Sequence, residues 1–211
     1  MKRFEPLSLL LAGTAALLVS AIDPYDRITW WLEVLPILIG APILILTYHR
    51  FRFTPLAYRL VFIHALILML GAHYTYARVP PGFWLQDLFD LSRNHYDRLG
   101  HFAQGFIPAI LAREILLRQT PLVPGKWLFF IVTSICLALS AFYEFTEWWA
   151  ALAGGEAADA FLGTQGDVWD TQWDMFLALL GAISAQILLA HRQDRELGRM
   201  ESAARARVQT S

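Results

Sequence analysis

The chain has 211 residues, of which 56% are hydrophobic and 17% are charged, and its mean hydropathy is +0.43. Soluble domains are about 45–50% apolar and about 25% charged, so this composition excludes a disordered or fibrous chain and favours a membrane protein. The 17 basic and 18 acidic side chains give a net charge of −1, which excludes the broad basic surface that nucleic-acid binding requires. The single cysteine, Cys136, excludes a disulfide framework and a cysteine-based metal site.

Six segments are apolar enough to predict transmembrane helices. A spanning helix needs about 20 mainly apolar residues, because the hydrocarbon core is about 30 Å thick. We expect helices at about residues 7–22, 30–48, 56–76, 97–117, 127–150 and 173–191, of which the first is short and the fourth is polar at both ends. The sequence therefore predicts an all-α polytopic bundle, with a single transmembrane domain over residues 1–192 and a basic cytoplasmic tail at 193–211.

The N-terminal segment permits two interpretations. Lys2 and Arg3 precede an apolar run that ends in Val19-Ser20-Ala21, a pattern that a cleavable signal peptide also shows. An uncleaved first helix is the favoured interpretation, because no exported soluble domain follows it. With the N-terminus inside, the cytoplasmic segments contain 13 Lys and Arg residues and the opposite side contains 4. The positive-inside rule then predicts that both termini are cytoplasmic.

Between the third and fourth predicted helices, residues 83–91 form a shorter amphipathic segment. Trp84, Leu85, Leu88 and Phe89 fall on one side when the segment is wound as a helix. We expect a short helix that lies in the membrane interface. Further along the chain, Arg113 and Glu114 are interpreted as a local ion pair, and Gly181 with Ala182 and Ala185 as small residues at a close helix contact.

Ionisable residues recur on one face of each of the last three predicted helices. The spacing of Asp97, His101 and Gln104 places them on one face of the fourth helix, directly after His95. The fifth helix carries Glu144 three residues before Glu147, with Tyr143 beside them. A further acidic series precedes the sixth helix and continues into its first turns. The series, which also contains a glutamine and a tryptophan, is Gln165, Asp167, Trp169, Asp170 and Asp174.

In the predicted topology these three polar faces lie at the same level, near the outer surface of the membrane. We therefore expect one pocket that opens to the extracytoplasmic side. Its carboxylates outnumber its basic groups, so either some carboxyls are protonated or a bound cation neutralises them. Histidine combined with carboxylates suits zinc, manganese or iron, whereas oxygen ligands alone suit calcium or magnesium.

A divalent metal ion is accordingly a candidate cofactor. The candidate metal ligands are His95, His101, Glu144, Asp167 and Asp170. The candidate catalytic residues are Glu147 and Asp174, and the expected lining of the pocket is Asp97, Gln104, Tyr143, Gln165 and Trp169. Helix capping is an alternative role for Asp97 and Asp170, because a helix N-terminus favours an acidic side chain.

Three strings resemble a known family. They are HYDRLGHFAQG at 95–105, EFTEW at 144–148 and GTQGDVWDTQWDM at 163–175. They resemble the YjdF family of bacterial inner-membrane proteins, and the resemblance extends over most of the chain. It implies a multi-pass protein of the bacterial inner (plasma) membrane and supplies no chemistry.

A second, shorter pattern is similar to the VanZ-like membrane proteins, which are linked to glycopeptide resistance. That pattern has an acidic residue four positions before a His-Phe pair, then a Glu, then an Asp shortly before a glycine-containing last helix. The matching residues are Asp97, His101, Phe102, Glu144, Asp174 and Gly181. The chain departs from the pattern at Glu147, where the VanZ-like proteins prefer Gln. The likeness implies a role in the cell envelope or with lipids.

Three functions stay open at this point. The first is a metal-dependent enzyme that acts on a lipid or another amphiphile at the outer leaflet. The second is a pathway for ions or protons, because carboxylates inside a membrane mark such routes. The third is a non-catalytic membrane module that binds a lipid, a metal or a protein partner. Membrane lipids are the expected partners in each case, no nucleic acid is expected, and the oligomeric state is open.

Overall fold

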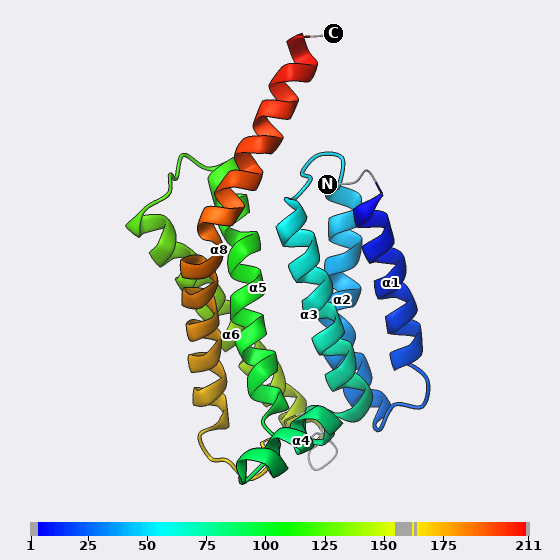
Figure 1. Cartoon of the computed structure of the whole chain (residues 1–211). Helices are drawn as coiled ribbons and strands as arrows, with labels where there is room; N and C mark the ends of the chain where they lie inside the picture. The colour runs from blue at the N-terminus through cyan, green and yellow to red at the C-terminus, as the bar shows by residue number, and fades with distance from the viewer. Residues whose placement is uncertain (1–3, 155–161, 163, 210–211) are drawn as a thin grey trace.

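The computed structural model of the chain describes residues 4–154, 162 and 164–209, and in these residues it contains helices and no strand. The helices, shown in Figure 1, are α1 (Glu5–Ser20), α2 (Arg27–Thr47), α3 (Pro55–Tyr74), the 3₁₀ turn η1 (Tyr76–Arg78), α4 (Pro80–Phe89), α5 (Tyr96–Gln119), α6 (Lys126–Gly154) and α8 (Asp170–Gln209). The predicted all-α class is confirmed.

Four of these helices are long and apolar enough to cross a membrane. They are α2, α3, α6 over Lys126–Ala153 and α8 over Asp170–Ala203. The apolar helix α1 is shorter, with 16 residues. Helix α5 has 24 residues but carries charged groups near both ends, which lowers its hydropathy. Both nevertheless run alongside the longer helices in Figure 1, so the bundle contains a helix at each of the six expected positions.

The bundle has two halves that meet along α3 and α5. Helices α1 and α2 pack on α3, whereas α6 and α8 pack on α5. Between the halves, the ring of Tyr76 fills the space beside Gly71 and Gly100, and the hydroxyl of Tyr96 donates to the carbonyl of Ile67 at 2.9 Å. Glycine at both positions is required here, because a Cβ at either one would overlap the Tyr76 ring.

Helices α5 and α8 approach each other more closely than side chains would allow. A Cβ at Gly105 would overlap the carbonyl of Ala178, and one at Gly181 would overlap the backbone of Phe102. The neighbouring Ala182 and Ala185 are also fully buried. Small residues permit such backbone contact in membrane helices. The predicted close contact at Gly181, Ala182 and Ala185 is therefore confirmed.

A layer of apolar side chains fills the middle of the second half. Ala109 and Ile110 of α5, Val132 and Cys136 of α6 and Ala182 of α8 belong to this cluster of buried residues. Along each helix this apolar layer lies between two polar regions. One is near the end of the bundle where α4 lies, and the other is toward the opposite end. Within the layer Gln186 of α8 donates to the hydroxyl of Thr133 of α6 at 3.0 Å, so the packing between the two polar regions is mainly apolar.

Two elements differ in extent from the expectation. The short helix expected at 83–91 is present as α4 but begins at Pro80, because proline is well placed in a first helical turn. The helix expected at 173–191 begins at Asp170 and continues without a break to Gln209, beyond the end of the bundle. The segment after His191 is rich in Arg and Ala and lacks proline, so helix propensity favours its continuation.

Candidate functional site

The candidate site is built around His101 of α5, whose side chain is buried. Its Nε2 atom lies 3.4 Å from Oδ1 of Asp97, one helical turn earlier, and 3.8 Å from Oδ2 of Asp174 on α8. On the other side of the ring, Nδ1 lies 3.7 Å from Oε1 of Glu144 on α6. Three helices therefore bring acidic side chains to a single imidazole.

The close packing of α5 on α8 explains why these groups meet. The contacts of Gly105 with Ala178 and of Gly181 with Phe102 lie within two turns of His101 and Asp174. They hold the two backbones together at the level of the site. On α5 itself, the spacing of four residues stacks Asp97 over His101, because side chains at i and i+4 share a helix face.

The cluster divides into two triads that share the histidine. Ligand atoms of Asp97, His101 and Asp174 lie within 4.8 Å of one another, and so do ligand atoms of His101, Glu144 and Glu147. All of these residues are buried except Glu147, which is half-buried. A histidine nitrogen with carboxylate oxygens is a ligand set that divalent transition metals accept.

Several polar atoms of the cluster make no hydrogen bond to any described residue. They are Nδ1 of His101, both carboxylate oxygens of Glu144 and Oδ1 of Asp174. Oγ of Ser140, one turn before Glu144, also makes no such hydrogen bond. The side chains of Glu144 and Asp174 are only 4% and 3% exposed. A buried polar group without a partner is costly, and a buried charge more so. These atoms therefore call for protons or a bound cation.

Sequence reasoning missed one member of the cluster, Glu33 of α2. Its side chain is buried, and Oε2 accepts a hydrogen bond of 3.1 Å from the hydroxyl of Tyr143. The ring of Tyr143 in turn lies edge-on to His101, with 6.1 Å between ring centroids. A signal was available, because Glu33 is the single acidic residue within the apolar segment 30–48 and acidic residues inside spanning helices are rarely incidental.

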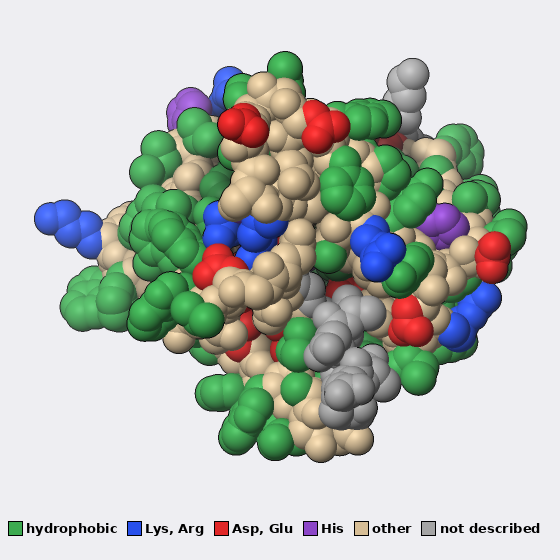
Figure 2. Space-filling view, turned by 90° about the horizontal axis from the view of Figure 1, so that it is seen from below, with side chains coloured by type: hydrophobic (Ala, Val, Ile, Leu, Met, Phe, Trp, Pro, Cys, Tyr) green, Lys and Arg blue, Asp and Glu red, His purple; other side chains and the backbone are tan. Residues whose placement is uncertain are grey.

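Asp167 and Asp170 belong to neither triad, because both form ion pairs with arginine side chains. Arg93 reaches Asp170 at 2.7 Å and Asp167 at 3.4 Å, and Arg98 reaches Asp167 at 2.9 Å. Arg93 also donates to the carbonyl of Thr164 at 2.7 Å. This network ties the segment before α8 to the start of α5. Figure 2 shows basic and acidic side chains side by side on this end of the bundle.

Gln165 reinforces the same connection and does not line the cluster. It accepts a hydrogen bond from the backbone N–H of Asn94 at 3.1 Å and donates to the carbonyl of Asn94 at 2.8 Å. His95, the residue that precedes α5, also lies outside both triads. Burial together with the positive charges of Arg98 and Arg93 lowers the pKa of His95. Of the remaining expected lining residues, Trp169 is exposed and Gln104 is half-buried.

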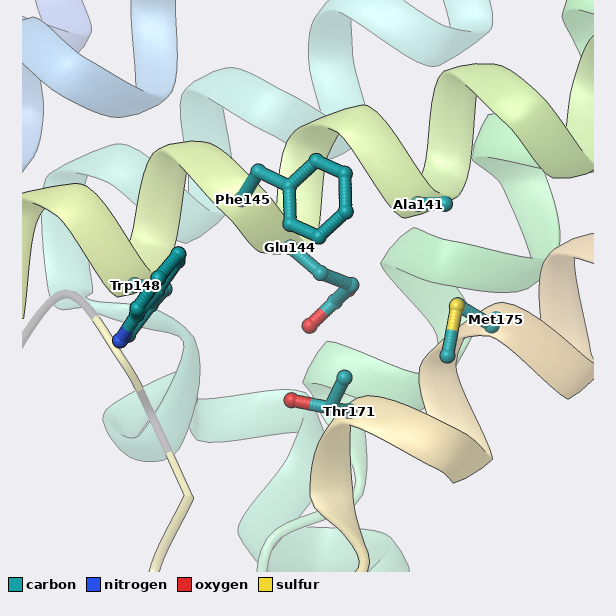
Figure 3. A pocket seen from close by; sticks show the side chains of 6 residues that line it. All are labelled: Ala141, Glu144, Phe145, Trp148, Thr171 and Met175. Carbon is teal, nitrogen blue, oxygen red and sulfur yellow. The ribbon is translucent and has the colours of Figure 1, made fainter.

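A groove adjoins the cluster between α6 and α8. Its volume is about 410 Å³, and its walls are mainly apolar. The lining residues are Ala141, Glu144, Phe145, Trp148, Thr171 and Met175. Figure 3 shows the Glu144 carboxylate directed into the space between the two helices. Glu144 thus belongs to the polar cluster and to the wall of the apolar groove at the same time.

The polar region at the other end of the bundle provides a contrast. Glu114 is fully buried, yet it accepts hydrogen bonds from the backbone N–H of Thr54 at 2.9 Å, from its hydroxyl at 2.7 Å and from Arg118 at 2.9 Å. Arg113 pairs with Asp194 of α8 at 2.7 Å. The expected pair between Arg113 and Glu114 is therefore wrong, because adjacent helical residues point in different directions.

Apolar spanning helices around a buried cluster of acids and a histidine define a helical membrane protein with an internal polar site. The family described as "Predicted membrane protein (DUF2238)" matches residues 6–195, and the chain belongs to this family. The chain is 53% identical over 189 residues to the "Inner membrane protein YjdF" of Escherichia coli (strain K12), a match that covers 90% of each chain. The resemblance noted in the three sequence strings is thereby confirmed. No solved structure matches the chain.

Proposed function

We propose that the chain is a metal-dependent hydrolase of a membrane amphiphile, with a divalent cation bound by His101, Glu144 and Glu147. The observation that carries the proposal is the double position of Glu144, which belongs to the cluster and lines the apolar groove. An ion at this triad lies beside a surface suited to an alkyl chain. The polar head of the amphiphile is then placed at the ion and its chain along Phe145 and Trp148.

The two nitrogens of His101 support a division of roles. Nδ1 faces Glu144 and is the nitrogen that binds the ion, whereas Nε2 faces Asp97 and Asp174. Metal-binding histidines commonly donate their other N–H to a carboxylate, which fixes the tautomer and the ring orientation. Asp97 and Asp174 are therefore positioning residues when this ion alone is bound.

The reaction is hydrolysis of an ester or a phosphoester. Three protein ligands leave at least one coordination position open, as catalytic zinc sites do. A divalent cation held there would lower the pKa of a bound water and polarise the oxygen that is attacked. The water adds to the acyl or phosphoryl centre, the bond to the leaving oxygen breaks, and that oxygen receives the proton. A Glu147 oxygen not bound to the ion carries this proton between the two oxygens.

We further propose that all six helices cross the bacterial inner membrane, with both termini in the cytoplasm and the tail after residue 192 on that side. The distribution of Lys and Arg supports this orientation. The cluster and the groove then lie in the outer half of the membrane. Lipids of the outer leaflet reach the groove laterally, between α6 and α8.

The two other functions receive less support. A route for ions or protons needs polar groups through the whole membrane, whereas the buried layer around Ile110, Val132 and Ala182 is mainly apolar and its buried Gln186 carries no charge. A non-catalytic module that binds a lipid would use the same groove, and the activity test below separates it from the hydrolase. It is the outcome to which a negative activity test leads.

The test uses the purified full-length chain in mixed micelles of phosphatidylethanolamine and phosphatidylglycerol, loaded with Zn²⁺ or Mn²⁺ and assayed for released head group and fatty acid. We expect release that EDTA abolishes and that Glu144→Gln lowers at least 100-fold. Trp148→Ala is expected to raise KM, whereas Trp84→Ala, at another exposed tryptophan on α4, leaves it unchanged. Metal-loaded protein that releases nothing from either lipid contradicts the hydrolytic function.

A further inference from the structure

The imidazole ring of His101 separates the cluster into two sides. Nε2 lies 3.4 Å from Asp97 and 3.8 Å from Asp174, whereas Nδ1 lies 3.7 Å from Glu144. A single cation binds one ring nitrogen and cannot reach both. An ion bound by His101, Glu144 and Glu147 therefore leaves the carboxylates on the Nε2 side without a cation.

A proton on Nε2 does not satisfy that side. One N–H donates to one acceptor, and here it faces two carboxylates. Asp97 is the nearer of them, and Oδ1 of Asp174 makes no hydrogen bond to any described residue although its side chain is only 3% exposed. The guanidinium of Arg93, which neutralises Asp170, is not paired with Asp174. Asp174 is thus a buried acid that requires either a proton of its own or a positive partner.

The total charge of the cluster also indicates that one cation is not enough. Glu33, Asp97, Glu144, Glu147 and Asp174 surround one histidine. One divalent ion compensates less than half of five negative charges, and buried charges are stable only when they are paired or bind metals. Two divalent ions bring four positive charges, against the five carboxylates and the one negative charge that His101 gains if its ring loses the N–H.

We infer that the cluster binds two divalent cations, one on each nitrogen of His101, with Asp97 and Asp174 as the carboxylate ligands of the second. When both ions are present the ring carries no N–H and bridges them as imidazolate, so loading the second ion releases a proton. The ligand set of nitrogen and carboxylate oxygens suits zinc, copper, cobalt or manganese. The second ion does not depend on hydrolytic activity at the first.

The test is the stoichiometry of Zn²⁺ on the full-length protein in detergent, measured by elemental analysis after dialysis. Wild type is expected to retain two equivalents, and Asp174→Asn and Glu147→Gln one equivalent each. Asp87→Asn, an exposed acid on α4, is the matched control and is expected to retain two. The Asn and Gln side chains keep the volume of the acids, and the circular dichroism spectrum of each variant verifies its fold.

A second readout needs no variant. Two Cu²⁺ ions joined by an imidazolate are magnetically coupled, so the electron paramagnetic resonance signal of protein with two Cu²⁺ is expected to fall below twice the signal of protein with one. If wild type retains one equivalent of Zn²⁺, and Glu147→Gln removes it whereas Asp174→Asn does not, the second site is overturned and the first is kept. If wild type retains one equivalent that Asp174→Asn removes and Glu147→Gln leaves, both assignments are overturned. Wild type that retains no metal overturns the proposed function as well. Two uncoupled Cu²⁺ ions overturn the bridge.

Discussion

The contact between α5 and α8 can be tested by adding one methyl group. In Gly105→Ala the new Cβ overlaps the carbonyl of Ala178. The overlapping atoms belong to the backbone, so no side-chain rotation relieves the contact and the two helices must move apart. Overpacking of a core costs typically about 1–3 kcal/mol. We expect the upper end of this range, about 3 kcal/mol, because both partners are held within long helices.

At about 2–4 °C per kcal/mol for a chain of this size, the variant should melt about 6–12 °C below wild type. Thermal unfolding in detergent, followed by circular dichroism, measures the difference. Gly40→Ala and Gly198→Ala are matched controls, because a Cβ at either position meets no described atom within 4 Å. Both should be neutral or more stable by about 0.5–1 kcal/mol, since alanine is the better helix former. A Gly105→Ala protein as stable as these controls refutes the backbone contact.

Three further predictions concern the polar groups. Glu114→Gln should destabilise the protein by about 3–5 kcal/mol in chemical denaturation, because it breaks a buried and fully paired network; a loss below about 1 kcal/mol contradicts that reading. Zn²⁺ at 100 times its dissociation constant should stabilise wild type by about 2.7 kcal/mol in thermal unfolding, and an equal effect on Glu144→Gln would show that the ion binds elsewhere. The lowered pKa of His95 means that this ring binds a proton less readily in the folded state than in the unfolded chain. Stability is therefore lost as the pH falls below about 6.5, and His95→Gln should lose less between pH 7 and pH 5 than wild type does.

Much of the candidate site follows from helix periodicity and topology. Asp97 and His101 share a face because they are four residues apart. Glu144 and Asp174 were expected at the same level because one helix ends where the other begins. These inferences need only the helix rise and the order of the spans. They depend on no packing detail, which explains why the residues of both triads were among the predicted site residues.

Helix periodicity and topology do not predict which residue each acidic side chain pairs with. Asp167 and Asp170 have the same helical spacing pattern as the acids of the cluster, yet they pair with Arg93 and Arg98. Glu33 reaches the site from α2 through the hydroxyl of Tyr143. In both cases the decisive contact joins residues that are far apart in the sequence. Spacing along one helix contains no information on which neighbour the side chain will meet.

The sequence by itself determined the helical class, the positions of six apolar or amphipathic segments and the family to which the chain belongs. These properties are local, because hydropathy and periodicity act over one or two helical turns. The tertiary structure decided that His101 presents its two nitrogens to different carboxylates and that Glu144 borders an apolar groove. Both follow from how closely α5, α6 and α8 approach one another. That distance is set where Gly105 and Gly181 allow two backbones to touch.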